Sequence, residues 1–175
     1  MLSIKNVDYI VFYDKEEIME FNIDVFKQFD KKWALLTAGD DKNFNTMTIS
    51  WGGLGTLFNK PVATVYVRKS RYTHEFLDKN EYFTISFFDE EYKKTLGILG
   101  AKSGRDIDKI NNSGLTPKRC GDSTTFAEAC VTLLCKKLFC DELKVDKLPA
   151  DIREAMYSNN PPHDMYIGEV VDIIK

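Results

Sequence analysis

Short β-like runs, separated by turn residues, constrain the fold of this chain more than any other feature of its sequence. The runs are rich in Val, Ile, Thr, Phe and Tyr, the residue types that favour strands. They cover residues 7–13, 33–38, 46–51, 62–68, 82–88, 129–139 and 165–174. The polar stretch at residues 39–43 predicts a hairpin turn between the second and third runs, and residues 59–61 separate the third from the fourth. Many strands at short spacing predict a mainly β chain, folded as an antiparallel β-barrel or sandwich with a few short helices.

Helix-like patterns are fewer and short. Asp89 is a predicted N-cap for a helix over residues 90–99, and a second helix is expected at residues 106–112, before Gly114. A third opens at residues 148–152, where a proline falls near its first turn. No Gly-x-Gly-x-x-Gly pattern follows a predicted strand, which argues against a parallel nucleotide-binding fold.

Length and charge narrow the class of protein. A chain of 175 residues predicts a single domain spanning residues 1–175. The formal net charge of -3 argues against a general nucleic-acid binder, which would carry a basic excess. No apolar run reaches the roughly 20 residues of a membrane span, and the first residues lack the basic start and apolar core of a secretory signal. We therefore expect a cytoplasmic protein that binds neither nucleic acid nor membranes.

The cysteines and histidines do not predict a metal site. Cysteines stand at positions 120, 130, 135 and 140, too widely spaced for the paired Cys-x-x-Cys ligands of structural zinc. Three of them fall in or beside an apolar strand-like run, so we expect buried or half-buried free thiols. His74 and His163 are the only histidines, and neither has a cluster of partner ligands nearby in the sequence. His74 is expected on the surface of a short helix.

The run at residues 45–51 alternates in a way that predicts a strand with two different faces. One face carries Asn45, Met47, Ile49 and Trp51, and the other carries Thr46, Thr48 and Ser50. Exposed backbone groups of such a strand can pair with the alternating donors and acceptors on the edge of a flat heterocycle. A half-buried strand with a Thr-rich solvent face is the alternative that the pattern alone leaves open.

A cationic cluster about twenty residues further on predicts a phosphate site. Arg68, Ser70, Arg71 and Thr73 lie where an apolar run ends and a short helix begins. Guanidinium groups and hydroxyls at a helix N-terminus suit a phosphate dianion. The alternative is a solvated charge cluster with a helix cap. A hydroxyl-lined strand beside a phosphate clamp predicts a flat, phosphorylated cofactor, and FMN is the best candidate.

The loop at residues 101–105 also combines hydrogen-bond donors with a flexible backbone. Gly104 permits close backbone approach, Lys102 and Ser103 supply donors, and a short helix is expected to follow. Arg105, Asp106 and Lys109 are expected in an ion-pair network on the surface.

Four segments together resemble the flavin reductase-like family, a group of FMN-binding proteins with a split β-barrel fold that includes the flavoredoxins. They are residues 45–51, 67–73, 103–109 and 163–170, and the resemblance runs from about Phe26 to the C-terminus. It implies a Greek-key antiparallel barrel and a homodimer that holds two FMN molecules at or near the subunit interface. It also implies NADH or NADPH as the reductant.

The resemblance extends to individual residues. Ala101, Lys102 and Ser103 match a family region that lies close to the flavin. His163 matches a histidine that family members place near the flavin and the nicotinamide, so it is the candidate catalytic residue. The stretch at residues 140–162 departs from the shorter flavin reductases. Its loop is expected either to cover the flavin or to fill the site of the second subunit.

The expected function is that of an FMN-binding oxidoreductase. Electrons would pass from NAD(P)H through bound FMN to a flavin or to another acceptor, either a small molecule or a protein. The cofactor carries such chemistry, so no triad or carboxylate pair is required in the sequence. The alternative is a flavoredoxin-like electron carrier or a non-catalytic FMN-binding protein.

Overall fold

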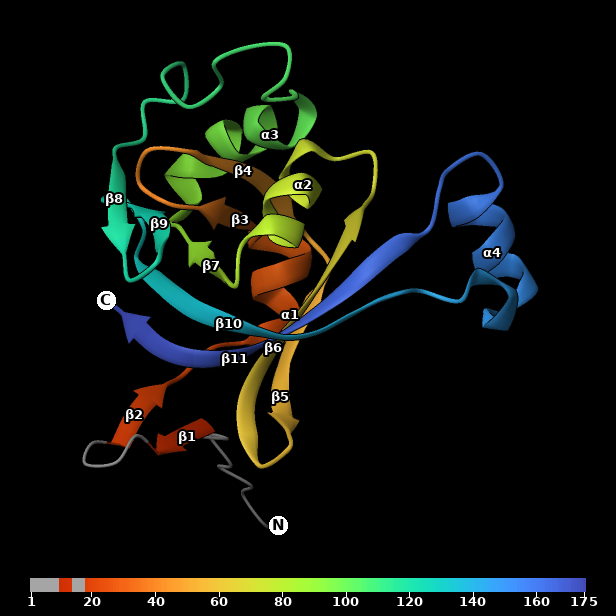
Figure 1. The fold of residues 1–175 in the computed structure, drawn as a ribbon, viewed down its shortest axis with the longest axis horizontal. Helices are drawn as coiled ribbons and strands as arrows, with labels where there is room; N and C mark the ends of the chain where they lie inside the picture. The colour runs from red at the N-terminus through yellow and green to blue at the C-terminus, as the bar shows by residue number, and fades with distance from the viewer. Residues whose placement is uncertain (1–9, 14–17) are drawn as a thin grey trace, which may run out of the picture.

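A computed structural model describes residues 10–13 and 18–175 of the chain. Its centre is one antiparallel sheet of seven strands in the order β4-β3-β7-β10-β11-β6-β5 (Figure 1). These strands are β3 (Ala34–Gly39), β4 (Phe44–Ile49), β5 (Gly52–Leu57), β6 (Lys60–Arg68), β7 (Tyr82–Phe87), β10 (Val131–Glu142) and β11 (His163–Ile174). The mainly β fold predicted from the sequence is confirmed.

The sheet curls round until its two outer strands approach each other. β4 and β5 stand at opposite ends of the strand order, yet only Ser50 and Trp51 join them along the chain. Among the described strands, β4 pairs only with β3 and β5 only with β6. The barrel is therefore split between β4 and β5, and the outer edge of β4 keeps backbone donors and acceptors available.

Two hairpins and several short helices surround the sheet. The hairpins pair β1 (Ile10–Tyr13) with β2 (Ile18–Phe21), and β8 (Pro117–Cys120) with β9 (Ser123–Phe126). The helices are α1 (Val25–Lys27), which runs into the π-helical turn η1 (Gln28–Lys32), α2 (Tyr72–Lys79), α3 (Lys93–Ala101) and α4 (Ala150–Tyr157). Two 3-10 turns, η2 (Glu90–Tyr92) and η3 (Val145–Lys147), precede α3 and α4. None of the helices in the described part of the chain has the length and apolar character needed to span a bilayer.

Two apolar clusters hold these elements together. The larger fills the barrel with side chains that are fully buried, including Leu36, Val65, Phe83, Ile85 and Tyr166. The smaller lies under α3 and includes Leu35, Leu96, Leu99 and Phe126. Burial of this kind contributes about 25 cal/mol per Å² of apolar surface removed from water. It fixes the positions of α3 and β4, which frame the candidate site.

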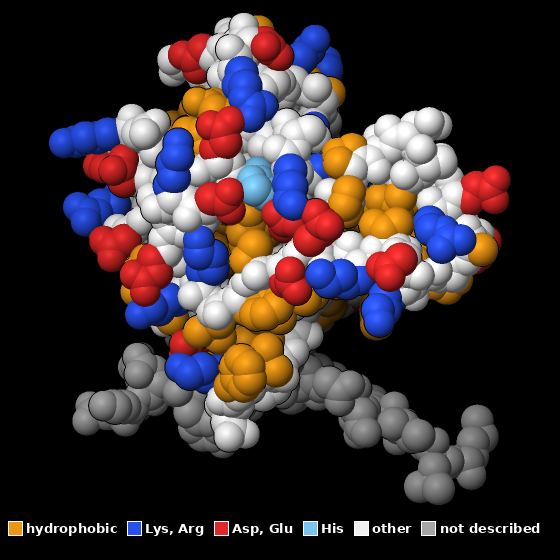
Figure 2. Space-filling model, turned by 45° about the vertical axis from the view of Figure 1, so that its right-hand side comes forward, with side chains coloured by type: hydrophobic (Ala, Val, Ile, Leu, Met, Phe, Trp, Pro, Cys, Tyr) orange, Lys and Arg blue, Asp and Glu red, His pale blue; other side chains and the backbone are white. Residues whose placement is uncertain are grey.

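Residues 143–162 form an arm that projects from the barrel between β10 and β11, and we call them the α4 arm (Figure 1). None of the residues of α4 is buried. Its Ile152 and Met156 are 44% and 42% exposed. Figure 2 shows hydrophobic side chains among the charged ones on the lobe at the right of that view. The arm thus presents apolar side chains that the described chain does not cover.

Most predicted elements are present, but one predicted helix is wrong. Residues 106–112 form turns, because the Asp108 carboxylate accepts hydrogen bonds from the Asn111 backbone N–H at 3.1 Å and from its Nδ2 at 2.6 Å. Such side-chain bonds compete with the helical pattern. Asp89 precedes a helical segment as expected, but its side chain makes no capping hydrogen bond. The hairpin at residues 39–43 is confirmed, whereas residues 7–9 of the first predicted run lie outside the described residues.

His74 was expected on the surface, and this expectation is wrong. Its side chain is buried, with Nε2 2.6 Å from Oδ2 of Asp164 and Nδ1 3.2 Å from Oδ2 of Asp78. Asp78 also accepts a hydrogen bond of 2.8 Å from the Tyr166 hydroxyl. An imidazole held between carboxylates on two elements ties α2 to β11. The network thereby fixes Thr73, which shares the first turn of α2 with His74.

All four cysteines are free thiols. Cys120 and Cys135 are buried, as expected, but Cys130 and Cys140 are exposed. Burial raises the pKa of the Cys120 thiol to about 11, so this thiol stays protonated and unreactive at neutral pH. No group of His, Cys, Asp or Glu side chains among the described residues is arranged to hold a metal ion.

Candidate functional site

A groove runs along the split of the barrel, from α2 and α3 at one end to the start of β11 at the other. It consists of three adjoining cavities of about 50, 300 and 170 Å³. Met47 of β4 lines all three of them, and the second and third share Thr48, Tyr66, Arg68 and His163. The groove is therefore narrowest beside α2 and α3 and wider toward β11.

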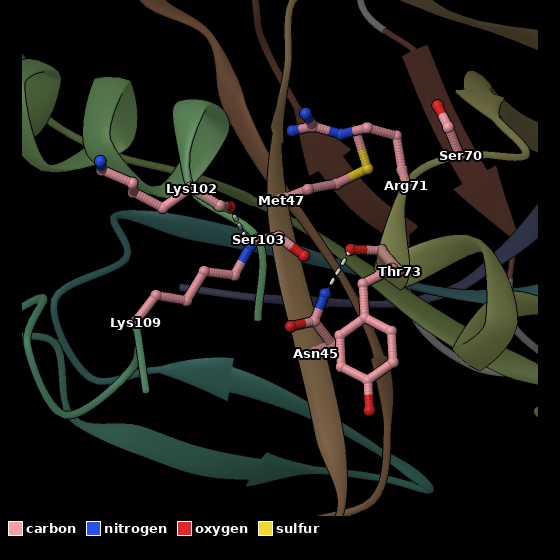
Figure 3. Close-up of a pocket in the computed structure, with 9 residues that line it drawn as sticks. Asn45, Met47, Ser70, Arg71, Thr73, Lys102, Ser103 and Lys109 are labelled. Atoms are coloured by element: carbon pink, nitrogen blue, oxygen red, sulfur yellow. Dashed lines mark hydrogen bonds between the residues drawn. The ribbon is translucent and has the colours of Figure 1, made fainter. Parts of the chain in front are cut away.

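The smallest cavity is a cationic pit (Figure 3). Its lining is Asn45, Met47, Ser70, Arg71, Tyr72, Thr73, Lys102, Ser103 and Lys109. The side chains come from β4, from the start of α2 and from the loop after α3, which meet only in the folded chain. No carboxylate forms an ion pair with Arg71, Lys102 or Lys109 within the described residues. A small cavity lined by cations without a carboxylate partner favours an anion over a cation or a neutral group.

Burial leaves the cations of the pit with little contact with water. Lys109 is only 3% exposed, and its Nζ donates to the backbone oxygens of Leu99 at 3.2 Å and Lys102 at 3.3 Å. Burial, followed by repulsion from the Arg71 guanidinium, lowers the pKa of Lys109 to about 8. The pKa of Arg71 is also lowered, mainly by burial and then by the charge of Arg68. Both cations are poorly solvated, so a bound anion gives each of them the partner that water provides elsewhere.

Close packing of β4, α2 and the loop after α3 shapes the wall of the pit. Nδ2 of Asn45 donates a 2.7 Å hydrogen bond to Oγ1 of Thr73, and both side chains are buried (Figure 3). Gly104 lies directly against this pair, because a Cβ placed there would stand 2.3 Å from Oδ1 of Asn45. α2 begins at Tyr72, and in its first turn the His74 N–H donates a 2.9 Å hydrogen bond to the Arg71 carbonyl. Arg71 also donates to the Gly100 carbonyl, which ties the end of α3 to the pit.

The opposite end of the groove is flat and aromatic. The Trp51 ring is 42% exposed, and its centroid lies 5.0 Å from that of the buried His163 ring. Nδ1 of His163 is 2.9 Å from the Tyr157 hydroxyl. Burial, followed by the Arg68 charge, lowers the pKa of His163 to about 4, so the imidazole is neutral at physiological pH.

Arg68 lies between the two ends of the groove and keeps one donor unused. Its Nη1 donates a 2.7 Å hydrogen bond to Oδ1 of Asn160, on the α4 arm. Its Nε is buried and has no hydrogen-bond partner among the described residues. Because an unpaired buried donor is costly, this nitrogen is a polar contact that a ligand in the groove can satisfy.

The structure brings together nearly all of the residues that the sequence nominated. Those lining the groove are Asn45, Met47, Thr48, Ile49, Ser50, Trp51, Arg68, Ser70, Arg71, Thr73, Lys102, Ser103 and His163. Ala101 differs, because it is the exposed last residue of α3 and lines none of the three cavities. Ile49 packs in the barrel core, and the Thr48 hydroxyl donates to the Leu96 carbonyl, so both side chains are engaged within the protein.

Three lining residues were not nominated as site residues. Lys109 was expected in a surface ion-pair network, and this is wrong, because its ammonium group is buried in the pit. Arg105, from the same expected network, does pair with Glu75 on the surface. Tyr72 and Tyr66 also line the groove. The position of Tyr72 inside the cationic cluster could have predicted that it lines the groove. The sequence around Lys109 and Tyr66 contains no such indication.

Comparison with known proteins identifies the fold. The model of the flavin reductase like domain family matches residues 26–174. A flavoredoxin from Methanosarcina acetivorans has a TM-score of 0.66 at 23% identity, with 91% of this chain and 75% of the other covered. An FMN-binding protein from Thermus thermophilus with bound 1-cyclohex-2-enone has a TM-score of 0.64 at 20% identity, with 86% of this chain and 73% of the other covered. An FMN-binding domain of a flavin reductases-like enzyme from Shewanella baltica OS155 has a TM-score of 0.61 at 20% identity, with 85% of this chain and 71% of the other covered. No curated protein sequence matches the chain.

Proposed function

Because the chain belongs to the flavin reductase-like family, we propose that it binds FMN in the groove and transfers electrons from NADH or NADPH to a flavin or another acceptor. The observation that carries the proposal is the cationic pit without a carboxylate partner, at one end of a groove whose other end is flat and aromatic. The FMN-binding protein of Thermus thermophilus and the flavoredoxin of Methanosarcina acetivorans, which share the fold, support it.

The residues of the groove fit FMN in three respects. Arg71 and Lys109 supply charge for a phosphate dianion. The outer edge of β4 offers backbone donors and acceptors to the pyrimidine edge of the isoalloxazine ring. The unpaired Nε of Arg68 offers a further donor between ring and phosphate.

When bound, FMN would supply the redox chemistry, and the protein supplies binding, orientation and exclusion of water. Arg71 and Lys109 of the pit would hold the phosphate, and Trp51 and Tyr66 would line the groove beside the ring. His163, neutral because of its low pKa, adds no charge beside the ring. Tyr157 fixes the orientation of the imidazole through Nδ1, and this leaves Nε2 as a polar contact for a nicotinamide amide.

The low pKa of Lys109 predicts that FMN affinity depends on pH. A phosphate dianion favours the ammonium form of Lys109. The affinity for FMN should therefore be highest below about pH 8, where Lys109 is already charged in the free protein. Above that pH a proton must be taken up on binding, and the dissociation constant should rise by up to about tenfold per pH unit. Titration of apoprotein with FMN from about pH 7 to pH 9.5 measures this effect.

A variant that stays charged is the control for that prediction. Lys109→Arg keeps a cation at every pH in this range, so its affinity for FMN should stay level where that of the wild type falls. A parallel decline in the wild type and the variant would assign the pH dependence to another group.

Anaerobic mixing with reduced nicotinamides tests the proposed electron transfer. The holoprotein should lose its flavin absorbance near about 450 nm within the mixing experiment when NADH or NADPH is added, as expected for flavin reduction. Reduction by only one of the two would identify the physiological donor. If neither nicotinamide bleaches the flavin, the hydride-transfer proposal is wrong.

A flavoredoxin-like electron carrier is the second candidate, and the α4 arm favours it. Asn160 of the arm is bonded to Arg68, and Tyr157 stands against His163, so the arm borders the face where a nicotinamide would bind. The low-identity flavoredoxin match supports the same candidate. Reduction of the flavin by a reduced electron-transfer protein, without a response to NADH or NADPH, is the outcome expected of a carrier.

We also propose that the chain forms a homodimer. Phe58 is 70% exposed, and Ile152 and Met156 of the α4 arm are 44% and 42% exposed. Both outer strands of the sheet have a free edge within the described chain. Exposed apolar surface of this kind is typical of subunit contacts. Sedimentation of the FMN-bound protein at micromolar concentration should give twice the chain mass of 20.1 kDa, and a single-chain mass would contradict the dimer.

A further inference from the structure

Another cavity, of about 740 Å³, adjoins the aromatic end of the groove at Trp51. The two share Ser50, Trp51 and Tyr66, so a molecule in one lies against an occupant of the other. Its volume falls within the range of about 300–1,000 Å³ that is typical of small-molecule sites. We call it the apolar pocket and define it by six of its lining residues: Phe26, Phe29, Trp51, Leu54, Tyr66 and Tyr157.

Aromatic rings dominate this pocket. Phe26 and Phe29 come from the α1 region, Trp51 from the link between β4 and β5, and Tyr157 from the α4 arm. Side chains from distant parts of the chain thus converge on one space. Aromatic walls favour flat ring compounds, which gain contact by stacking or by meeting ring edges.

The charges of the lining exclude an anionic ligand. Asp30 is the only ionised side chain in the described lining, and its carboxylate pairs with Nζ of Lys31 at 2.6 Å. No Lys, Arg or His of the described chain lines the pocket. A phosphate or sulfonate placed here would lose water without gaining a cation. The cationic pit and the apolar pocket therefore select opposite kinds of chemistry.

One polar group in the pocket remains available to a ligand. The Tyr66 hydroxyl makes no hydrogen bond with any described residue, whereas the Tyr157 hydroxyl stands 2.9 Å from Nδ1 of His163. A single free hydroxyl suits one carbonyl or hydroxyl group on an otherwise apolar ring. Gly53 of β5 leaves the floor of the pocket open, because a Cβ built there meets nothing within 4 Å.

We propose that the apolar pocket binds a flat, uncharged ring compound that carries one hydroxyl or carbonyl group. This names the class of the second ligand for the proposed function, and it rests on that function only for the presence of a flavin next to the pocket. The binding itself is a property of the protein wall, so it can be measured without turnover.

Calorimetric titration with a matched pair of probes tests the proposal. The probes are 2-naphthol, which is uncharged at neutral pH, and naphthalene-2-sulfonate, which has the same rings and a negative charge. The full chain with bound FMN should bind one 2-naphthol per chain, and the sulfonate at least about tenfold more weakly. A separate titration of apoprotein with FMN shows whether a failure belongs to this pocket or to the flavin site.

Two glycines of β5 provide a variant and its control. Gly53→Val fills the floor of the pocket and should weaken 2-naphthol binding at least about tenfold. Gly55→Val, on the same face of the strand but outside the pocket lining, also meets nothing within 4 Å and should change the affinity by less than about twofold. Both variants should fold, because valine is a better strand residue than glycine.

Three results would overturn the proposal. The first is equal binding of the two naphthalene probes, or no binding of 2-naphthol. The second is an equal effect of Gly53→Val and Gly55→Val on 2-naphthol affinity. The third is a change of sedimentation mass in Gly53→Val that accompanies the loss of binding, because that result would assign this face to a second copy of the chain.

Discussion

Replacing Arg71 with alanine is expected to weaken FMN binding about tenfold or more, while the affinity for riboflavin stays within about twofold. The guanidinium is one of two poorly solvated cations in the pit, and no carboxylate of the described chain pairs with it. A charge-assisted hydrogen bond to a phosphate contributes about 1.5–3 kcal/mol. Riboflavin has no phosphate, so it cannot lose this contact. Titration of wild type and variant with both flavins measures the difference.

Arg71→Lys is the control for this variant, since Arg71 also donates to the Gly100 carbonyl. The lysine keeps the charge but not the paired donors of the guanidinium, so its loss of FMN affinity should be smaller than that of the alanine variant. If Arg71→Ala weakens FMN and riboflavin equally, the side chain supports the groove and does not bind the phosphate.

Replacing His163 with alanine is expected to slow flavin reduction by NAD(P)H about 10- to 100-fold, the order expected for losing one oriented polar contact. The variant should still bind FMN, because His163 lies at the opposite end of the groove from the cationic pit. Its imidazole is neutral and stands 5.0 Å from the Trp51 ring between centroids. Stopped-flow reduction at saturating nicotinamide gives the limiting rate.

Tyr157→Phe separates positioning from direct contact. This variant keeps the imidazole but removes the hydroxyl 2.9 Å from Nδ1, so it should slow reduction less than His163→Ala does. An unchanged limiting rate in a well-folded His163→Ala variant would show that His163 has a structural role only.

The strands of this fold could be predicted because their side chains alternate and their turns carry Gly, Asp and Asn. β5 was missed, since three of its residues are glycines and glycine has a low strand propensity. Gly52 is nevertheless required there, because a Cβ would stand 2.6 Å from the Phe29 ring. The predicted helix at residues 106–112 is absent because the Asp108 side chain accepts a hydrogen bond from the Asn111 backbone N–H, and this bond forms a turn.

The part of the candidate site whose residues lie close together in the sequence could be predicted. Arg68, Ser70, Arg71 and Thr73 adjoin one another, and their polar side chains are enough to mark a phosphate site. Lys109 was missed, because its burial depends on α3 and the following loop folding back over it, and no local pattern records that contact. The same holds for His74, whose carboxylate partner Asp164 lies on the last strand, about ninety positions away.

Parallel titration of the wild-type apoprotein with FMN and with riboflavin tests whether the groove along the split of the barrel binds FMN through its phosphate. We expect one FMN per chain, bound about 100-fold more tightly than riboflavin, as two charge-assisted contacts of about 1.5–3 kcal/mol each would give at the lower end of that range. Equal affinities for the two flavins, or no binding of FMN, would contradict the claim.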